Sequence, residues 1–302
     1  PNIGRLINKI FSLIVIIFPS KLINSFISKR LGFDFKYSES DIIINAAGGS
    51  NLGVYKDWYY LAYIRFIQNN YKKIRLVNLG NSIEKTNSLI FNYYMKKALR
   101  SFDYLLLRES LSIKHAKDMN VACQRTPDIV LYDGLKEKIC QPNIDFLDSD
   151  YIVCCFNNLS AWHPRFPDNT QIDGFYLSVV NFLIDKGFNI LIIPQLYGNR
   201  SVNYETPLYY KKLFKNYDKS HRISVLDEEY SVLAQLNLIS NCKYLIGARY
   251  HSLIYSIKYN VPFIPLCYEN KMIGLLDDID LKDLCIDLRE KYSLDDFDKK
   301  FR

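Results

Sequence analysis

The sequence predicts an α/β protein built from two doubly wound, Rossmann-like domains, and three observations favour this class. From residue 40 onward, short apolar runs of strand length alternate with amphipathic stretches of helix length. The runs are almost continuously apolar, which is typical of parallel strands covered on both faces. The alternation stops at Gln141–Asp150 and then begins again, which indicates a linker. We therefore expect domains at residues 1–145 and 146–302.

Each half of the chain contains its own series of expected elements. In the first half, the expected strands are 41–45, 74–79, 104–107 and 128–131, and the expected helices are 56–70 and 86–100, with a short helix after residue 110. In the second half, the expected strands are 151–156, 189–193, 221–226, 243–246 and 262–267, and the expected helices are 172–186, 228–240 and 250–259.

The composition is that of a packed globular protein. Among 302 residues, 49% are hydrophobic and 24% are charged, which excludes a disordered, collagen-like or disulfide-stapled chain. Seven cysteines and four histidines are scattered without the spacing of metal ligands, so we expect no metal and reduced thiols. The formal charge is +7, and no basic stripe with interleaved aromatics stands out, so we expect no nucleic acid partner.

The first thirty residues are both apolar and basic. Residues 10–18 (IFSLIVIIF) are flanked by Lys and Arg residues, at positions 5, 9, 21, 29 and 30. The apolar run is shorter than the roughly 18 residues that a spanning helix needs. Two alternatives remain, namely a basic apolar helix on an anionic bilayer surface and a helix packed on its own domain.

Candidate ligand loops follow the expected strands, because ligands bind outside the carboxyl ends of parallel strands. In the first domain, Gly48-Gly49-Ser50-Asn51 would let a ligand approach the backbone, or would form only a tight turn. This loop matches neither a dinucleotide fingerprint nor a phosphate-binding P-loop. Arg108 and Glu109 end another strand, either as a ligand contact or as an ion pair that steadies the loop.

The second domain has a stronger candidate at Gly247–Ser252. Arg249 would stand at a helix start, where its planar fork and the free N–H groups both suit an anion. His251 titrates near neutral pH and can transfer a proton. The alternative is a surface Arg and a structural His. Further candidates in the second domain are Lys271 after the last strand, Gln195 at a strand end, and His163 and Arg165 in a long polar loop.

Four segments resemble the polysaccharide pyruvyl transferase family over about Asp41–Lys271. They are DIIINAAGGSN (41–51), LLLRESLSIKHAK (105–117), TPDIVL (126–131) and LIGARYHSLIYSIKYNVPFIPLCYENK (245–271). The last is the most specific, because it combines Arg-x-His-Ser at a helix start with a Pro-led strand and Tyr-x-x-Lys. The resemblance implies a GT-B-like arrangement and transfer of pyruvate from phosphoenolpyruvate to a sugar as a ketal.

The resemblance also implies roles for residues of this chain. Arg249 and His251 match the catalytic Arg and His of the family, and Lys271 matches its last Lys. The family's Arg after the first strand of the second domain is replaced by Phe156-Asn157-Asn158, with Arg165 the nearest substitute. We expect donor binding by Arg249, Lys271, Arg165, Ser252 and Gln195. We expect acceptor binding by Gly48, Gly49, Ser50, Asn51, Arg108, Glu109 and His163.

The expected protein is a cytoplasmic pyruvyltransferase that needs no cofactor. Its acceptor would be a sugar of a bacterial capsule, O-antigen or exopolysaccharide. A lipid-linked acceptor would explain segment 1–30 as a peripheral contact with the inner membrane. Two alternatives stay open, namely a GT-B glycosyltransferase that uses a nucleotide sugar and a non-catalytic carbohydrate-binding relative.

Overall fold

The computed structural model divides the chain into two compact units, Pro1–Ile129 (unit 1) and Val130–Arg302 (unit 2). The described residues are 3–18, 26, 27, 29–33, 41–46, 48, 51–132, 144, 147, 149–161, 163, 165–195, 207–215, 220–227 and 230–302. The boundary between the two units, after Ile129, precedes the domain boundary expected at 145/146. Its physical reason is that Val130 and Leu131 already pack against the core of unit 2.

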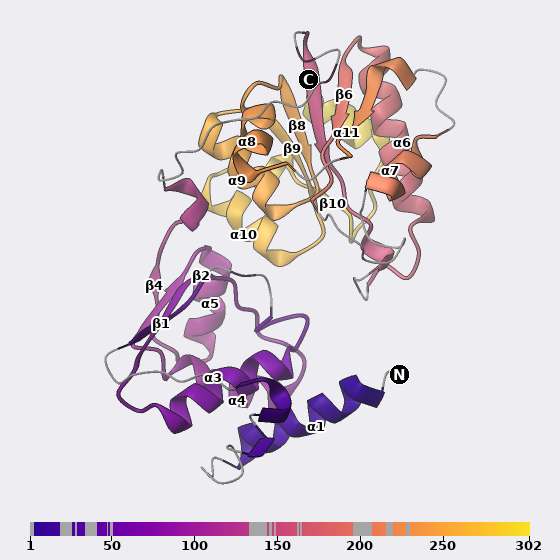
Figure 1. Cartoon of the computed structure of the whole chain (residues 1–302). Helices are drawn as coiled ribbons and strands as arrows, with labels where there is room; N and C mark the ends of the chain where they lie inside the picture. The colour runs from indigo at the N-terminus through magenta and orange to yellow at the C-terminus, as the bar shows by residue number, and fades with distance from the viewer. Residues whose placement is uncertain are drawn as a thin grey trace. The chain divides into compact units, whose positions relative to one another are not determined.

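Unit 1 is built on four parallel strands that lie in chain order (Figure 1). They are β1 (Ile42–Asn45), β2 (Arg75–Asn81), β3 (Tyr104–Leu107) and β4 (Gln124–Arg125). The helices between them are α3 (Trp58–Asn70), α4 (Leu89–Leu99) and α5 (Ser110–Asp118). Asp57 and Ser88 fix the starts of α3 and α4, because each side chain accepts a backbone N–H of the first turn.

The crossover helices of unit 1 lie on one face of its sheet. Right-handed crossovers between parallel strands in chain order place every helix on the same side. Leu105 and Leu107 of β3 face that side and are buried. Ile42 and Ile44 of β1 face the other side, and each keeps 57% of its surface exposed. The expectation that both faces are covered is therefore wrong at β1.

The strand expected at 128–131 is also wrong. The partner of β3 is β4, which ends before Pro127, a residue without an N–H for a strand ladder. The buried carboxylate of Asp128 then accepts a hydrogen bond from Arg108 at 2.8 Å. The chain turns there into a single 3-10 turn, Ile129–Leu131.

Helix α1 (Ile3–Ile17) packs against α3. Val15 and Ile16 enter the core of unit 1 and are 0% and 1% exposed. This packing confirms that one face of the apolar segment folds onto its own domain, and a bilayer contact of its other face stays a prediction. None of the helices in the described part of the chain has the length and apolar character that crossing a bilayer requires.

Unit 2 contains six parallel strands in the order β10-β9-β8-β5-β6-β7 (Figure 1). They are β5 (Tyr151–Cys155), β6 (Asn189–Ile192), β7 (Ile223–Val225), β8 (Tyr244–Gly247), β9 (Phe263–Cys267) and β10 (Ile286–Asp287). The helices are α6 (Thr170–Asp185), α7 (Pro207–Leu213), α8 (Val232–Ser240), α9 (Tyr250–Tyr259), α10 (Asn270–Asp278) and α11 (Leu294–Phe301). Every residue of β5 and β9 is buried, as expected for a sheet covered on both faces.

The sequence patterns missed four elements of unit 2, namely α7, α10, β10 and α11. Strand β10 has only two residues, which is too short for a periodic signal. Helix α11 is strongly charged, yet its Phe297 is fully buried and its ring lies 5.8 Å from that of Phe182 on α6. The Phe301 ring of the same helix lies 5.1 Å from that of Tyr244, so Phe297 and Phe301 both hold this helix on the unit.

Candidate active site

The carboxyl ends of β5 and β8 mark the place in unit 2 where a ligand is expected. The chain winds from β5 toward β6 in one direction and from β8 toward β9 in the other. Ligands of doubly wound sheets bind where the winding reverses. Here the buried Asn157 donates Nδ2 to the Ala248 carbonyl oxygen at 3.0 Å and accepts the Tyr176 hydroxyl at 2.8 Å. Asn157 therefore ties the loop after β5 to the turn after β8.

Arg249 lies in the turn from β8 to α9, and its position depends on Gly247. A Cβ atom at Gly247 would lie 2.6 Å from Leu253 Cδ2 and 2.8 Å from Ser252 Oγ. Arg249 is the N-cap residue of α9 with an extended backbone (φ −120°, ψ 136°), and its side chain is half-buried. The guanidinium group of Arg249 and the amino end of α9 therefore belong to the same turn. Both attract anions.

Replacing Gly247 by Ala should lower the free energy of unfolding by about 1–3 kcal/mol through overpacking. Leu245 and Leu253 are both 0% exposed, so their side chains have no space into which to move. Gly174 on α6 is the matched control, because a Cβ atom there meets nothing within 4 Å. Gly174→Ala should stabilise the helix by about 0.5–1 kcal/mol. Urea unfolding measures both, and a Gly247→Ala protein as stable as wild type would contradict this account.

His251 is exposed in the first turn of α9. Its ring meets the edge of Tyr250 at a centroid distance of 5.5 Å and stacks on Tyr255 at 6.3 Å. The two tyrosines restrict the ring on the helix surface, and the residue as a whole stays exposed. An accessible imidazole two residues after Arg249 is placed to exchange a proton with a ligand at that turn.

Lys271 lies beside the same tyrosine. Its Nζ atom is 6.0 Å from the centroid of the Tyr250 ring and 2.7 Å from Oε2 of Glu269. The Lys271 and Glu269 side chains are only 13% and 3% exposed. Lys271 stands in the first turn of α10, which follows β9, the neighbour of β8. The fold thus brings Lys271 next to the Arg249 turn and adds a buried carboxylate that offsets its charge.

His163 is a buried residue of the same unit, with 4% of its surface exposed. Its ring packs edge-on against Phe166 at 5.1 Å and Tyr268 at 5.7 Å. Burial lowers the pKa of His163, and nearby cations lower it further against the opposing effect of Glu269. This neutral ring supports Tyr268, and its predicted contact with an acceptor sugar stays a prediction.

Arg165 is exposed and lines a surface cavity of about 870 Å³. Arg289 also lines the cavity, and hydrogen bonds to Asp287 at 2.6 and 2.8 Å and to the Asn270 side chain at 2.6 Å fix its guanidinium group. The ring of Tyr292 also lines the cavity. Arg165 is thus a rim residue of this cavity, and its donor contact stays a prediction.

Two further predicted donor residues have partners within unit 2. Ser252 is fully buried, and its hydroxyl donates to the Arg249 carbonyl at 2.6 Å. It therefore shapes the turn rather than presenting a hydroxyl to solvent. The Gln195 side chain lies near Cys155, the last residue of β5. Its Nε2 atom is 4.0 Å from Cys155 Sγ and 3.5 Å from Gln235 Oε1. These long contacts leave its amide weakly held.

In unit 1, Arg108 is the centre of a buried network at the carboxyl edge of the sheet. Its guanidinium group donates to Asp128 at 2.8 Å, to Ser82 Oγ at 3.1 Å and to the Gly48 carbonyl at 3.2 Å. Glu109 Oε2 lies 3.5 Å from Arg108 Nε, and Glu109 also accepts the Ser112 hydroxyl. This geometry favours an ion pair that steadies the loops over direct contact with a ligand.

The predicted glycine loop is only partly described. Gly49 and Ser50 lie outside the described residues. A Cβ atom at Gly48 would lie 2.8 Å from Asn81 Oδ1, so the loop approaches β2 too closely for a side chain. Asn51 accepts the backbone N–H of Asp57 at 3.1 Å through its carbonyl oxygen. Acceptor contacts of this loop stay predictions.

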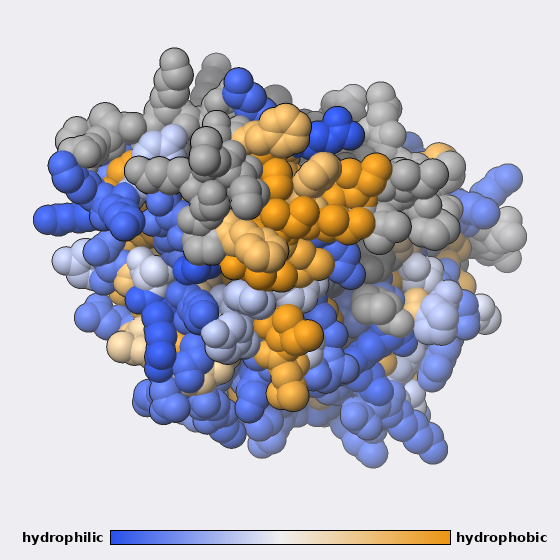
Figure 2. Space-filling model, turned by 90° about the horizontal axis from the view of Figure 1, so that it is seen from below, coloured by the Kyte–Doolittle hydropathy of each residue, from blue (hydrophilic) through white to orange (hydrophobic). Residues whose placement is uncertain are grey.

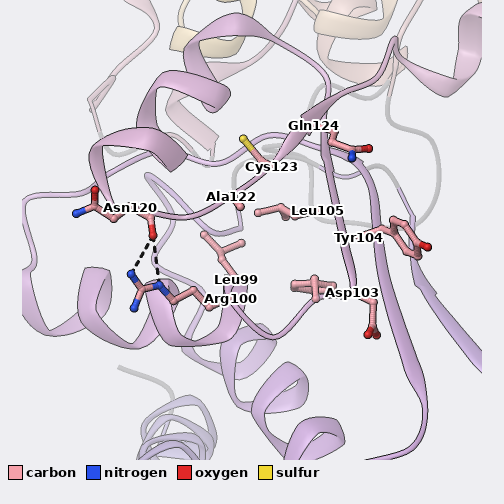
Figure 3. Close-up of a pocket in the computed structure, with 10 residues that line it drawn as sticks. Leu99, Arg100, Asp103, Tyr104, Leu105, Asn120, Ala122, Cys123 and Gln124 are labelled. Atoms are coloured by element: carbon pink, nitrogen blue, oxygen red, sulfur yellow. Dashed lines mark hydrogen bonds between the residues drawn. The ribbon is translucent and has the colours of Figure 1, made fainter.

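Figure 3 shows a separate pocket of about 450 Å³ in unit 1. It is lined by Tyr104 and Gln124, which begin β3 and β4, and it therefore lies at the amino edge of the sheet. Arg100 closes one side by donating to the Asn120 carbonyl at 2.9 and 3.3 Å. The pocket is at the opposite edge of the sheet from the predicted ligand loops.

Comparison with known protein families identifies the family of this chain. The profile described as "Polysaccharide pyruvyl transferase" matches residues 3–270. The chain belongs to the polysaccharide pyruvyl transferase family. A curated relative, the amylovoran biosynthesis protein AmsJ of Erwinia amylovora, is 20% identical over 221 residues. That match covers 70% of this chain and 53% of AmsJ, so it spans about half the length of the relative.

Solved structures confirm the predicted α/β, GT-B-like fold class of this pyruvyl transferase family member. A UDP-N-acetylglucosamine 2-epimerase from Listeria monocytogenes has a TM-score of 0.51 at 9% identity, with 87% of this chain and 73% of that chain covered. A trehalose 6-phosphate synthase from Burkholderia multivorans has a TM-score of 0.51 at 10% identity, with 92% and 66% covered. At such identities the likeness concerns the fold alone.

Three residues lie within the loops that the sequence marked as candidates, but the sequence analysis assigned no individual role to them. Asn157 bridges the loops after β5 and β8, Tyr250 lies near both His251 and Lys271, and Glu269 pairs with Lys271. A usable signal existed for two of them, because Asn157 and Glu269 each stand two residues after a buried strand. Tyr250 carried no such signal, since an aromatic in a first helical turn is usually a packing residue.

Proposed function

We propose that this chain transfers pyruvate from phosphoenolpyruvate to two hydroxyl groups of a sugar and forms a cyclic ketal. The observation that carries the proposal is the grouping of Arg249, His251 and Lys271 around Tyr250, at the carboxyl edge of the unit 2 sheet. Phosphoenolpyruvate carries a carboxylate and a phosphate. An Arg fork, a Lys and a helix amino end are groups that bind such anions.

The proposed chemistry assigns the proton to His251. A proton adds to the methylene carbon of phosphoenolpyruvate, and C2 becomes an oxocarbenium-like centre. One sugar hydroxyl attacks C2, the C2–O bond to phosphate breaks, and the second hydroxyl closes the ketal. The two sugar hydroxyls release two protons. One returns to the acid that protonated the methylene carbon, and the other leaves with inorganic phosphate. His251 is the accessible proton carrier nearest in sequence to Arg249, and Arg249 holds the anionic donor.

The proposed acceptor is a sugar of a bacterial surface polysaccharide or of its lipid-linked precursor, made in the cytoplasm. The name of AmsJ as an amylovoran biosynthesis protein supports a polysaccharide context. Gly48, Asn51, Arg108 and Glu109 would act on the acceptor side. For Arg108 we propose a positioning role, because its guanidinium group is engaged inside unit 1.

Thermal unfolding with added ligand tests the donor. Phosphoenolpyruvate at a hundredfold excess over its Kd should stabilise the protein by about 2.7 kcal/mol and raise Tm. Arg249→Ala should lose this rise. Arg222→Ala, before β7 at the amino edge of the same sheet, should keep it. A rise only with UDP, GDP or CMP sugars would instead identify a glycosyltransferase, and no rise with any of them would favour a non-catalytic relative.

A further inference from the structure

Helix α1 exposes apolar side chains that do not pack into the core of unit 1. Ile10 and Ile17 are 49% and 46% exposed, and their spacing of seven residues places them on one face of the helix. Phe18, after the helix, is 55% exposed, and Phe26 is 78% exposed. We call these four residues the α1 surface. A helix that is apolar on both faces is normally covered on both.

Apolar side chains form a patch on the side of the molecule that carries α1. Figure 2 views the molecule from below relative to Figure 1, where α1 lies, and shows orange side chains gathered there. Arg30, four residues after Phe26, contacts α1, because its guanidinium group lies over the Phe11 ring at 5.9 Å from its centroid. Patches of this kind mark contacts with proteins or membranes.

The charge around the α1 surface points to the partner. Residues 1–33 contain five Lys and Arg and no Asp or Glu, so they hold +5 of the formal charge of +7. The rest of the chain carries 34 Lys and Arg against 32 Asp and Glu. Lys9, Lys29 and Arg30 are exposed beside the apolar residues. A segment with five cations and no carboxylate of its own, next to exposed aliphatic and aromatic side chains, matches an anionic bilayer surface.

We infer that the α1 surface docks on an anionic lipid bilayer, with α1 lying in the plane of the interface. The exposed Ile and Phe side chains would enter the boundary between headgroups and acyl chains, while the cations contact anionic headgroups. The helix has 15 residues and cannot span the hydrocarbon core. The inference does not depend on the proposed reaction, but it would bring the site to any lipid-linked acceptor.

Vesicle flotation of the whole chain tests the inference without turnover. Wild-type protein should float with phosphatidylcholine vesicles that contain phosphatidylglycerol, and binding should fall as salt screens the charges. Phe18→Ser with Phe26→Ser, and Lys29→Glu with Arg30→Glu, should each weaken partitioning by more than about tenfold. The matched controls lie on α7, namely Leu208→Ser at a side chain 59% exposed and Lys212→Glu at an exposed cation.

Four results would overturn the inference. They are no flotation of the wild type at low salt, equal binding to neutral vesicles, equal loss in the α7 controls, and a wild-type dimer that the Phe18→Ser, Phe26→Ser variant converts to monomer without any vesicle binding. The last would assign the α1 surface to a second copy of the chain. Circular dichroism checks the fold of each variant, and the salt and lipid series on the wild type needs no variant.

Discussion

His251→Gln is expected to reduce acceptor-dependent phosphate release from phosphoenolpyruvate by about 10²–10⁴-fold, the usual contribution of a positioned general acid. Glutamine keeps hydrogen-bonding groups but cannot carry a proton at neutral pH. Because His251 is exposed, the replacement should change the free energy of unfolding by no more than about 0.5 kcal/mol. The assay uses an acceptor sugar that supports turnover by the wild type.

The matched control for this variant is His221→Gln. His221 is also exposed, but it precedes β7 and so lies at the amino edge of the unit 2 sheet. The His251 variant should still be stabilised by phosphoenolpyruvate, whereas Arg249→Ala should not, which separates proton transfer from donor binding. Wild-type turnover of His251→Gln would mean that the acid is another group.

The fold of unit 2 was predictable because two of its strands, β5 and β9, are buried along their whole length. Continuous apolar runs such as YIVCC and FIPLC are typical of parallel strands that are covered on both faces. In the structure, β5 and β9 are both buried throughout. The strand order was not readable, because it depends on which edges pair after the helices have packed. That order places α9 and α10 next to each other and so brings Lys271 to Tyr250.

The site was predictable where a residue follows a strand, and not where burial decides its chemistry. Arg249 and His251 were proposed from the strand end and the helix start alone, and the structure places both at the start of α9, whereas their role stays a prediction. The local sequence does not reveal that Glu269 and His163 are buried, since their burial comes from distant segments. Likewise, Asp128–Leu131 has the apolar character of a strand, but Pro127 and the Arg108–Asp128 bond end the sheet first.

Arg108→Met should lower the free energy of unfolding of unit 1 by about 3–5 kcal/mol, the cost of leaving a buried partner charge uncompensated. The Arg108 and Asp128 side chains are 2% and 1% exposed, and methionine cannot replace the donated hydrogen bonds. Trp58 reports on this unit, because its indole lies edge-on to Phe91 at 5.0 Å. Urea unfolding followed by fluorescence in a Trp162→Phe background therefore isolates the unit 1 transition.

Two comparisons decide whether Arg108 steadies the unit or contacts a ligand. Arg100→Met removes a guanidinium that bonds the Asn120 carbonyl at the exposed end of α4, and it should cost less than about 1 kcal/mol. Arg108→Met with Asp128→Asn should recover part of the loss, because it also removes the uncompensated carboxylate. An Arg108→Met protein that keeps the stability of the wild type but loses turnover would instead make Arg108 a ligand contact, since a purely structural ion pair cannot be broken without weakening unit 1.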